Sequence, residues 1–256
     1  MDPPALLEAR GLSKEFGGVM AVNGVDFAVR DGQIVALIGP NGAGKTTIFN
    51  VITGVFPPSR GSVCFRGQCL GGLRPHAIAA LGIGRTFQAV QLFGEMTVLE
   101  NVMVGRHAKS RAGILASALH TPSMRREERA IREQSLALLD TVGLGEKADQ
   151  AAANLPYGEQ RLTEIARALA LEPVILLLDE PGAGLNRQEK ARLAALIRRL
   201  RDRGITIFLV DHHMDLVMEI SDEVLVLNYG EKIAEGPPGE VQRHPGVIAA
   251  YLGEGE

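Results

Sequence analysis

A glycine-rich loop with a lysine and two threonines follows a short apolar run near the start of the chain. The run is Ile34–Ile38, and the loop consists of Gly39, Pro40, Asn41, Gly42, Ala43, Gly44, Lys45, Thr46 and Thr47. Glycines let consecutive backbone N–H groups turn toward one anion, because no Cβ interferes. Lys45 can reach the terminal phosphates of a nucleoside triphosphate, and the Thr46 hydroxyl can ligate Mg²⁺. The fixed positions of the pattern G-x-x-x-x-G-K-[ST] are all met, so the sequence predicts a phosphate-binding loop and not a plain glycine turn.

A pair of carboxylates follows a second apolar run. Val174–Leu178 contains only apolar residues, as a strand buried on both faces of a parallel sheet does, and Asp179 and Glu180 come directly after it. Ligands of open α/β sheets bind at the carboxyl ends of the strands. We expect Asp179 to hold the Mg²⁺ shell and Glu180 to polarise the attacking water. A strand end turned by Pro181 would explain the same residues, but the upstream loop favours the catalytic interpretation.

A glycine also stands at the start of a predicted amphipathic helix. The helix covers Arg161–Ala170, and the residues before it are Leu155, Pro156, Tyr157, Gly158, Glu159 and Gln160. The N-terminus of a helix attracts anions through its unpaired N–H groups and its dipole. The chain is therefore predicted to have two helix starts that can face phosphates.

The elements that position these residues can be read from periodicity. Alternating or apolar runs predict strands at 5–12, 22–29, 63–65, 83–87, 174–178, 206–210, 224–227 and 232–235, and helices at 48–52, 187–203 and 214–220. Strand-like runs are absent from Ala89 to Ala170, where Met124–Val142 has helical spacing that ends at Gly143. We expect one α/β core of residues 1–88 and 171–256, with antiparallel strands at its start and a helical lobe, 89–170, inserted in it.

Composition limits the function classes. The chain has 256 residues, of which 46% are hydrophobic and 22% charged, and a formal net charge of −3, which argues against a general nucleic-acid coat. No apolar run approaches the roughly 20 residues that span a bilayer. The first residues, Met1–Pro4, lack the features of a secretory signal, so we expect a cytoplasmic protein. In that reducing compartment Cys64 and Cys69 are expected to be unpaired thiols.

The segment 155–160 resembles the signature motif of ATP-binding cassette (ABC) ATPases, written L-S-G-G-Q, and it lies just upstream of the aspartate-glutamate strand as in that family. The resemblance implies an α/β P-loop NTPase of the ABC type, with a mixed β core, an antiparallel β subdomain and an inserted α-helical subdomain. It also implies a head-to-tail dimer, in which the signature of one subunit covers the ATP held by the loop of another.

Further family elements match position by position. Phe16 stands where an aromatic residue stacks on adenine, although a strand-end core phenylalanine would look the same. Gln88 matches the Q-loop glutamine, which contacts Mg²⁺ and the attacking water. His212 matches the switch histidine that hydrogen-bonds the γ-phosphate, and its neighbour His213 is assigned no role. The segment 182–186 resembles the D-loop between subunits, or a plain loop before a helix capped by Asn186.

Two residues depart from the signature. Pro156 replaces the serine, and Tyr157 replaces the first glycine. Proline offers neither a hydroxyl nor an N–H, so one or two hydrogen bonds to the nucleotide of the other subunit are missing, each worth about 1.5–3 kcal/mol with a charged acceptor. Gly158 and the helix behind it keep backbone N–H groups for the phosphate, so we expect a working site.

One branch of the family is similar over essentially the whole chain, namely the ATPases of branched-chain amino acid importers. The similarity lies in Phe16-Gly17-Gly18 with Ala21-Val22, Thr121-Pro122-Ser123, the Tyr-Gly-x-Gln signature, Ala183-Gly184-Leu185-Asn186, Met214-Asp215-Leu216-Val217-Met218 and Ala250-Tyr251-Leu252-Gly253. The resemblance implies ATP and Mg²⁺ as cofactors, a second cassette, identical or related, and membrane permeases as partners, and a peripheral position on the cytoplasmic face of the inner membrane.

Several alternatives stay open. ATPases of urea or amide importers and of lipopolysaccharide export have similar chains. The short insertion and the single cassette argue against ABC proteins that act on chromosomes or ribosomes. The presence of Glu180, Gln88 and His212 argues against a non-catalytic regulatory subunit. Near Val90–Met103, the apolar residues Leu92, Phe93 and Val98 are expected to be exposed and to receive a short permease helix, unless they pack within the helical lobe.

Overall fold

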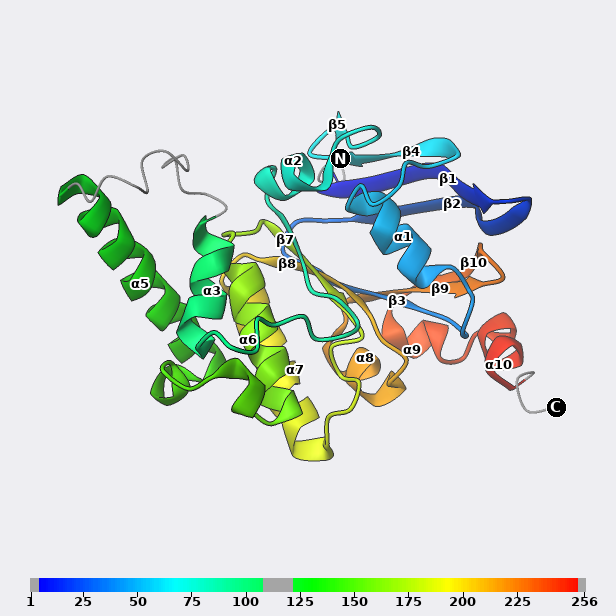
Figure 1. The fold of residues 1–256 in the computed structure, drawn as a ribbon. Coiled ribbons are helices and arrows are strands. Elements are labelled where there is room, and N and C mark those ends of the chain that lie inside the picture. The colour runs from blue at the N-terminus through cyan, green and yellow to red at the C-terminus, as the bar shows by residue number, and fades with distance from the viewer. Residues whose placement is uncertain (1–4, 108–121, 253–256) are drawn as a thin grey trace. The chain divides into compact units, whose positions relative to one another are not determined.

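The structure is a computed structural model that describes residues 5–107 and 122–252 (Figure 1). Thr121 and Gly253, which belong to two of the branch motifs, and Met1–Pro4 lie outside the described residues. The chain divides into two compact units. We call Met1–Arg85 with Val174–Glu256 the core unit and Thr86–Pro173 the helical unit.

The described part of the core unit contains two sheets. The antiparallel sheet has the order β2-β1-β4-β5 and consists of β1 (Leu7–Phe16), β2 (Val19–Val29), β4 (Arg60–Phe65) and β5 (Gln68–Cys69). The second sheet has the order β10-β9-β3-β8-β7-β6 and is parallel except for its edge strand β10. Its strands are β3 (Ile34–Ile38), β6 (Ile83–Arg85), β7 (Ile175–Asp179), β8 (Thr206–Val210), β9 (Glu223–Asn228) and β10 (Glu231–Gly236). The mixed core and the antiparallel subdomain are as predicted.

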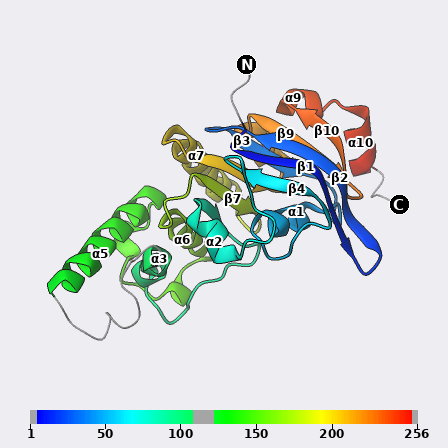
Figure 2. The same cartoon turned by 90° about the horizontal axis from the view of Figure 1, so that it is seen from above.

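Helix α1 (Lys45–Ile52) lies between the two sheets (Figure 1). Its residues Ile48, Phe49 and Ile52 are buried in the same hydrophobic core as side chains from both sheets. The other helices of the unit, several of which are seen from above in Figure 2, are α2 (Pro75–Ala80), α7 (Arg187–Asp202), α8 (Met214–Ile220), α9 (Pro238–Val241) and α10 (Pro245–Leu252). The core therefore fixes α1, and with it the loop that precedes it, against the parallel sheet.

The predicted strands and helices of the core unit are present, with some different bounds. Residues 175–179 and 206–210 are buried along their whole length, as two-faced parallel strands must be. β1 and β2 extend to the turn at Gly17-Gly18, because antiparallel partners continue their ladder to the hairpin. β6 is shorter than predicted and ends at Arg85, where its pairing with β7 stops.

The prediction of unpaired cysteines is wrong. Cys64 and Cys69 form a disulfide between β4 and β5. They are direct partners across this ladder, joined through a turn in which Arg66 and Gly67 have positive φ values of 50° and 76°. Because the hairpin already holds the two thiols together, closing the bond requires little further loss of chain entropy.

The described part of the helical unit consists of helices and one isolated bridge between Thr97 and Ala151. The helices are α3 (Val98–His107), α5 (Pro122–Val142) and α6 (Tyr157–Leu169), with 3-10 turns at Gly145–Lys147 and Ala152–Asn154. α3 approaches α6 so closely that a Cβ on Gly105 would lie 2.3 Å from the Arg167 carbonyl oxygen.

The expected exposure of the apolar residues near α3 holds only in part. The side chain of Phe93 is 50% exposed, but Val98 is fully buried, so its prediction as a surface residue is wrong. Val98 begins α3, whose apolar residues pack inside the helical unit, and its N–H donates to the Gln150 carbonyl at 2.9 Å.

Within residues 5–107 and 122–252, no helix has both the length and the apolar character to cross a membrane.

Candidate functional site

The three motifs of the core unit meet at one edge of the parallel sheet. β8 lies between β3 and β7, and Val210 at its end is the register partner of both Leu37 and Asp179. The glycine loop follows β3, Asp179 ends β7, and Asp211 with His212 follows β8. Because parallel strands end at the same edge, residues far apart in the sequence are brought to one place, the usual ligand position of such sheets.

The glycine loop is held by its own lysine and by close packing. The buried Lys45 ammonium donates to the carbonyl oxygens of Gly39 (2.6 Å) and Pro40 (2.8 Å). Gly39 has φ 149°, and a Cβ there would lie 2.2 Å from the Leu227 carbonyl oxygen. Gly44 has φ 100°, and its Cβ would lie 2.4 Å from the Ala21 carbonyl oxygen. Both glycines are therefore required by the backbone as well as by any phosphate.

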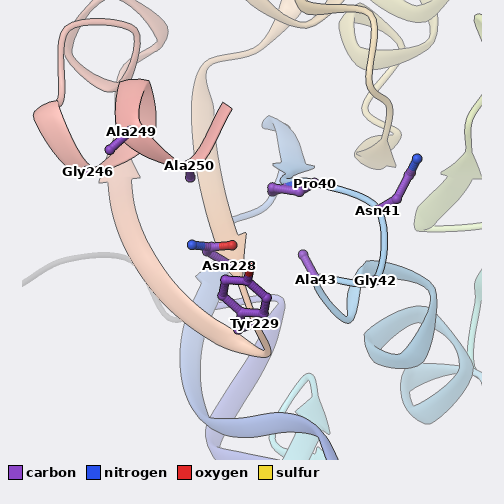
Figure 3. Close-up of a pocket in the computed structure, with 9 residues that line it drawn as sticks. All are labelled: Pro40, Asn41, Gly42, Ala43, Asn228, Tyr229, Gly246, Ala249 and Ala250. Carbon is purple, nitrogen blue, oxygen red and sulfur yellow. The ribbon is translucent and has the colours of Figure 1, made fainter. Parts of the chain in front are cut away.

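Thr46 and Thr47 lie in the first turn of α1, where Thr46 is exposed. On another side of the loop is a hollow of about 390 Å³. It is lined by Pro40, Asn41, Gly42, Ala43, Asn228, Tyr229, Gly246, Ala249 and Ala250 (Figure 3). Lys45 and Thr46 do not line it, so this hollow lies next to the predicted phosphate position and is not the same place.

Asp179 is buried and forms an ion pair with Arg85. The guanidinium Nη2 lies 3.0 Å from Asp179 Oδ2, and Nη1 donates to Asn50 Oδ1 and to Thr53 Oγ1, both at 2.8 Å. Asn50 belongs to α1 and Thr53 caps its end. Arg85 thus ties the helix behind the phosphate loop to the carboxylate at the end of β7.

Glu180 has an unusual backbone. Its φ is 46°, in the left-handed region that side chains rarely adopt, and such conformations cluster at functional sites. The Glu180 N–H donates to the Val210 carbonyl at 2.7 Å. His212 Nδ1 lies 3.6 Å from Glu180 Oε2, and the His212 side chain is 51% exposed. The predicted base and the predicted switch histidine therefore lie side by side at the sheet edge.

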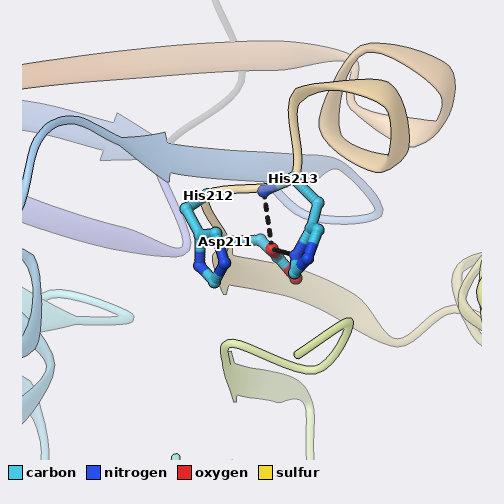
Figure 4. Close-up of side chains that lie close together, drawn as sticks. All are labelled: Asp211, His212 and His213. Carbon is cyan, nitrogen blue, oxygen red and sulfur yellow. Dashed lines mark hydrogen bonds and ion pairs between the residues drawn. The ribbon is translucent and has the colours of Figure 1, made fainter. Parts of the chain in front are cut away.

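A buried aspartate precedes the two histidines. Asp211 Oδ1 accepts from the His213 N–H at 2.9 Å and lies 2.7 Å from His213 Nδ1 (Figure 4). Asp211 Oδ2 accepts from the Gly182 N–H at 2.9 Å. The carboxylate thus connects the loop after β8 with the loop after β7. Asp211, His212 and His213 have metal-ligating atoms within 4.8 Å of one another, but both Asp211 oxygens are engaged in these bonds.

Phe16 ends β1 with its ring 43% exposed, so it is not a core residue. Its ring packs edge-to-face on Phe56, with centroids 5.0 Å apart, and the Lys14 ammonium lies 4.9 Å from its centroid. An exposed aromatic surface beside a cation suits the face of a flat heterocycle.

The signature residues start α6 in the helical unit. Leu155 and Gly158 are buried, and Pro156 and Tyr157 are exposed. Pro156 is the N-cap without a side-chain cap, and its carbonyl accepts from the N–H groups of Glu159 and Gln160. The Glu159 carboxylate pairs with Lys147 at 2.6 Å, and the Gln160 amide donates to the Leu155 carbonyl at 2.9 Å. Gln88, in the same unit, has an exposed side chain.

Comparison with known families agrees with these motifs. A family model described as ABC transporter matches residues 22–183, and one described as Branched-chain amino acid ATP-binding cassette transporter matches residues 231–256. The high-affinity branched-chain amino acid transport ATP-binding proteins BraF of Pseudomonas aeruginosa and LivG of Escherichia coli are each 47% identical over 97% of this chain and 98% of their own. The chain belongs to the ATP-binding proteins of branched-chain amino acid ABC transporters.

Solved structures support the same fold. The ADP conformation of MJ1267, an ATP-binding cassette of an ABC transporter, is 32% identical with a TM-score of 0.86, covering 98% of this chain and 100% of that one. A dimeric structure of MJ0796, a bacterial ABC transporter cassette, has a TM-score of 0.77 at 25% identity, covering 91% and 98%. As an ABC ATPase, the protein hydrolyses ATP to drive transport.

Sequence reasoning about this ABC ATPase missed four buried charged residues, namely Arg85, Arg161, Glu164 and Asp211. Each is next to or close to a predicted motif, and each bonds to a predicted site residue or to a loop that carries one. Charged residues are rarely buried without a partner. The sequence signal was their proximity to the motifs, but neither their burial nor their partners could be read from it.

Proposed function

We propose that this ABC ATPase powers the import of branched-chain amino acids through partner permeases, as a peripheral subunit on the cytoplasmic face of the inner membrane. The support is the identity of 47% to BraF and LivG over nearly their whole length, together with the family match at 231–256. Partner permeases follow from the transport role of the proteins that it resembles.

The catalytic assignment rests on one observation, the shared register partner of Leu37 and Asp179 at Val210. With the γ-phosphate bound at the loop, Glu180 would polarise the attacking water, and His212 would form a hydrogen bond with the γ-phosphate. Gln88 is assigned the contact with Mg²⁺ and the attacking water. Gly39 to Thr47 hold the phosphates, and Phe16 stacks on the adenine.

Thr46, Asp179 and Gln88 are the residues that would hold Mg²⁺. They offer a hydroxyl, a carboxylate and an amide carbonyl, the hard oxygen donors that this ion takes. The ion would neutralise charge on the β- and γ-phosphates during transfer. Asp179 is held in place for this by Arg85.

A second cassette completes the site. The first N–H groups of α6, at Tyr157 and Gly158, come before those of Glu159 and Gln160, which donate to the Pro156 carbonyl, and they can face a phosphate of another subunit. The signature then covers the nucleotide across a homodimer or a heterodimer with a related cassette. The dimeric cassette structure of MJ0796 supports such an arrangement. Pro156 removes one donor from this interface, so closure depends on backbone groups.

Turnover of a Glu180→Gln variant tests the catalytic part. The variant should bind ATP as the wild type does and release phosphate about 10²–10⁴-fold more slowly, because general-base assistance is worth that much. It should also accumulate as a dimer with ATP, measured by light scattering. Unchanged phosphate release would contradict the assignment of Glu180.

Uptake measurements test the solute. The chain would be reconstituted in vesicles with the permeases, second cassette and binding protein encoded beside it. ATP-dependent uptake of leucine but not of urea is expected. Uptake of urea or amides, or assembly with export components in place of a binding protein, would reject the amino-acid assignment.

A Phe93→Asp variant should lose membrane association if the exposed Phe93 contacts a permease.

A further inference from the structure

Arg161 is the largest fully buried side chain in the described residues. It lies on α6, one turn after the signature residue Tyr157. Its Nη1 donates to the Phe87 carbonyl and its Nη2 to the Gln88 carbonyl, both at 2.6 Å. A buried guanidinium is costly to desolvate, so its donors are expected to be matched by well-placed acceptors. Here two of these acceptors are consecutive carbonyls of one loop.

Glu164, one turn further along α6, completes the contact with this loop. Its Oε2 accepts from Arg161 Nη1 at 3.0 Å, and its Oε1 accepts from the Phe87 N–H at 3.2 Å. Burial raises the pKa of the Glu164 carboxyl, whereas the Phe87 N–H, Arg161 and Arg167 oppose that rise. The pair therefore holds both the N–H and the carbonyl of Phe87, and the carbonyl of Gln88.

Tyr157 connects the same guanidinium to the signature. Arg161 Nη2 donates to the Tyr157 hydroxyl at 3.1 Å, and the guanidinium lies 5.8 Å from the ring centroid. Tyr157 is the residue that replaces the first signature glycine, and its own ring is 43% exposed. One nitrogen, Nη2, thus contacts a signature side chain on one side and the Gln88 backbone on the other.

We propose that Arg161, supported by Glu164 and Tyr157, is a positioning residue that couples the signature to Gln88. The inference rests on the proposed roles of Gln88 and of the signature. When the signature helix turns or shifts on contact with the nucleotide of the other subunit, Arg161 moves the backbone of Phe87 and Gln88 with it. The tyrosine at the glycine position gives the signature a side-chain link that glycine could not provide.

Such coupling predicts a separation of turnover from nucleotide binding. The phosphate loop lies in the core unit, so a change at Arg161 should leave the affinity for ATP intact. Turnover at saturating ATP should fall, because Gln88 is no longer placed by the signature helix. A displacement of about 1 Å of a reacting group can reduce turnover about 10²-fold.

The test uses the full chain, with its permeases where turnover requires them. Arg161→Lys keeps the charge but cannot reach two carbonyls and the hydroxyl together, and Tyr157→Phe removes only the hydroxyl. Each is expected to lower kcat about 10-fold or more, while KM and the affinity for an ATP analogue stay within twofold. The double variant should be no worse than the more severe single variant, because both break one connection.

Arg106→Met is the matched control. Arg106 is also on the helical unit, where it pairs with Glu172 and donates to the Ala170 carbonyl, but it contacts neither Gln88 nor the signature in the bonds described. Arg106→Met should lower thermal stability without lowering kcat. Equal kcat losses in the control and in Arg161→Lys, or additive losses in the double variant, would overturn the coupling. A Gln88→Ala variant tests the proposed role of Gln88 separately from the coupling. If Gln88→Ala keeps full turnover, the proposed role of Gln88 is rejected. If Gln88→Ala loses turnover but Arg161→Lys does not, only the coupling is rejected.

Discussion

The guanidinium of Arg85 lies 3.0 Å from the carboxylate of Asp179, and both side chains are more than nine-tenths buried. The same guanidinium holds Asn50 and Thr53 at the end of α1. Asp179 is the residue expected to serve Mg²⁺, so its carboxylate is positioned from one side before any metal binds. Two elements that carry predicted site residues, α1 and β7, are thereby fixed to each other by one side chain.

Replacing Arg85 with methionine should destabilise the protein strongly. The change keeps most of the volume but leaves the buried Asp179 carboxylate without this cation, and breaking a buried pair typically costs about 3–5 kcal/mol. Guanidinium denaturation would give the free energy of unfolding. The control is Arg201→Met, which removes half-buried or exposed pairs with Asp202 and Asp222 and should cost less than about 1 kcal/mol. If both variants lost a similar amount of unfolding free energy, the larger contribution expected of the Arg85–Asp179 pair would be contradicted.

Asp211→Asn should reduce turnover more than stability. The carboxylate accepts from the Gly182 N–H with one oxygen and from His213 with the other, and an amide has only one acceptor oxygen. Loosening the loops after β7 and β8 moves Glu180 and His212, so kcat is expected to fall about 10-fold or more.

Asp222→Asn is the matched control for this change. Asp222 Oδ2 accepts from the Ile34 N–H at 2.7 Å, so it also connects two strands of the sheet, but at the start of β3 instead of its end. The Asp222→Asn variant should be less stable than the wild type and should have the same kcat. If steady-state assays showed the same kcat for Asp211→Asn and the wild type, the positioning role of Asp211 would be rejected.

Removing the disulfide should have a small effect. The bond joins residues only 5 apart in the sequence, and the chain-entropy model gives about 2 kcal/mol for so short a loop. Cys64→Ser with Cys69→Ser, or reduction of the wild type, should lower the free energy of unfolding by no more than this. Phosphate release should not change, because the bond lies in the antiparallel sheet and the site in the parallel one. A loss of turnover on reduction would show that the hairpin contributes to the site.

Glu223→Gln should stabilise the protein at neutral pH. Burial raises the pKa of the Glu223 carboxyl and repulsion from Glu235 adds to the rise, while Arg30 and Lys232 oppose it. Because the pKa is higher in the folded state, the protonated carboxyl stabilises the fold. This stabilisation is complete below the pKa of the unfolded state, about 4.3, and is lost as the pH rises through the pKa of the folded state. The gain from glutamine should therefore appear above that range and vanish below it. Denaturation curves of both proteins across the pH range would show this, and a pH-independent difference would contradict it.

The motifs of the candidate site could be recognised from local sequence. The phosphate loop, the aspartate-glutamate pair after an apolar strand and the glycine at the start of α6 are short motifs, in which neighbouring residues do one job. Their flanking strands and helices were predicted because periodicity is also local. The ABC family, its fold and the branched-chain branch followed from the order of these motifs along the chain.

Tertiary structure decided which side chains are buried and which groups they contact. Cys64 and Cys69 are paired because a hairpin registers them, against the expectation from the compartment. Val98 is buried because α3 packs within the helical unit. Arg85 with Asp179, Asp211 with Gly182 and Arg161 with Gln88 could not be predicted, because a charged residue near a motif looks the same whether it is solvated or buried. Its role depends on which acceptors the folded chain brings within hydrogen-bonding distance, and strand order and helix packing set that distance.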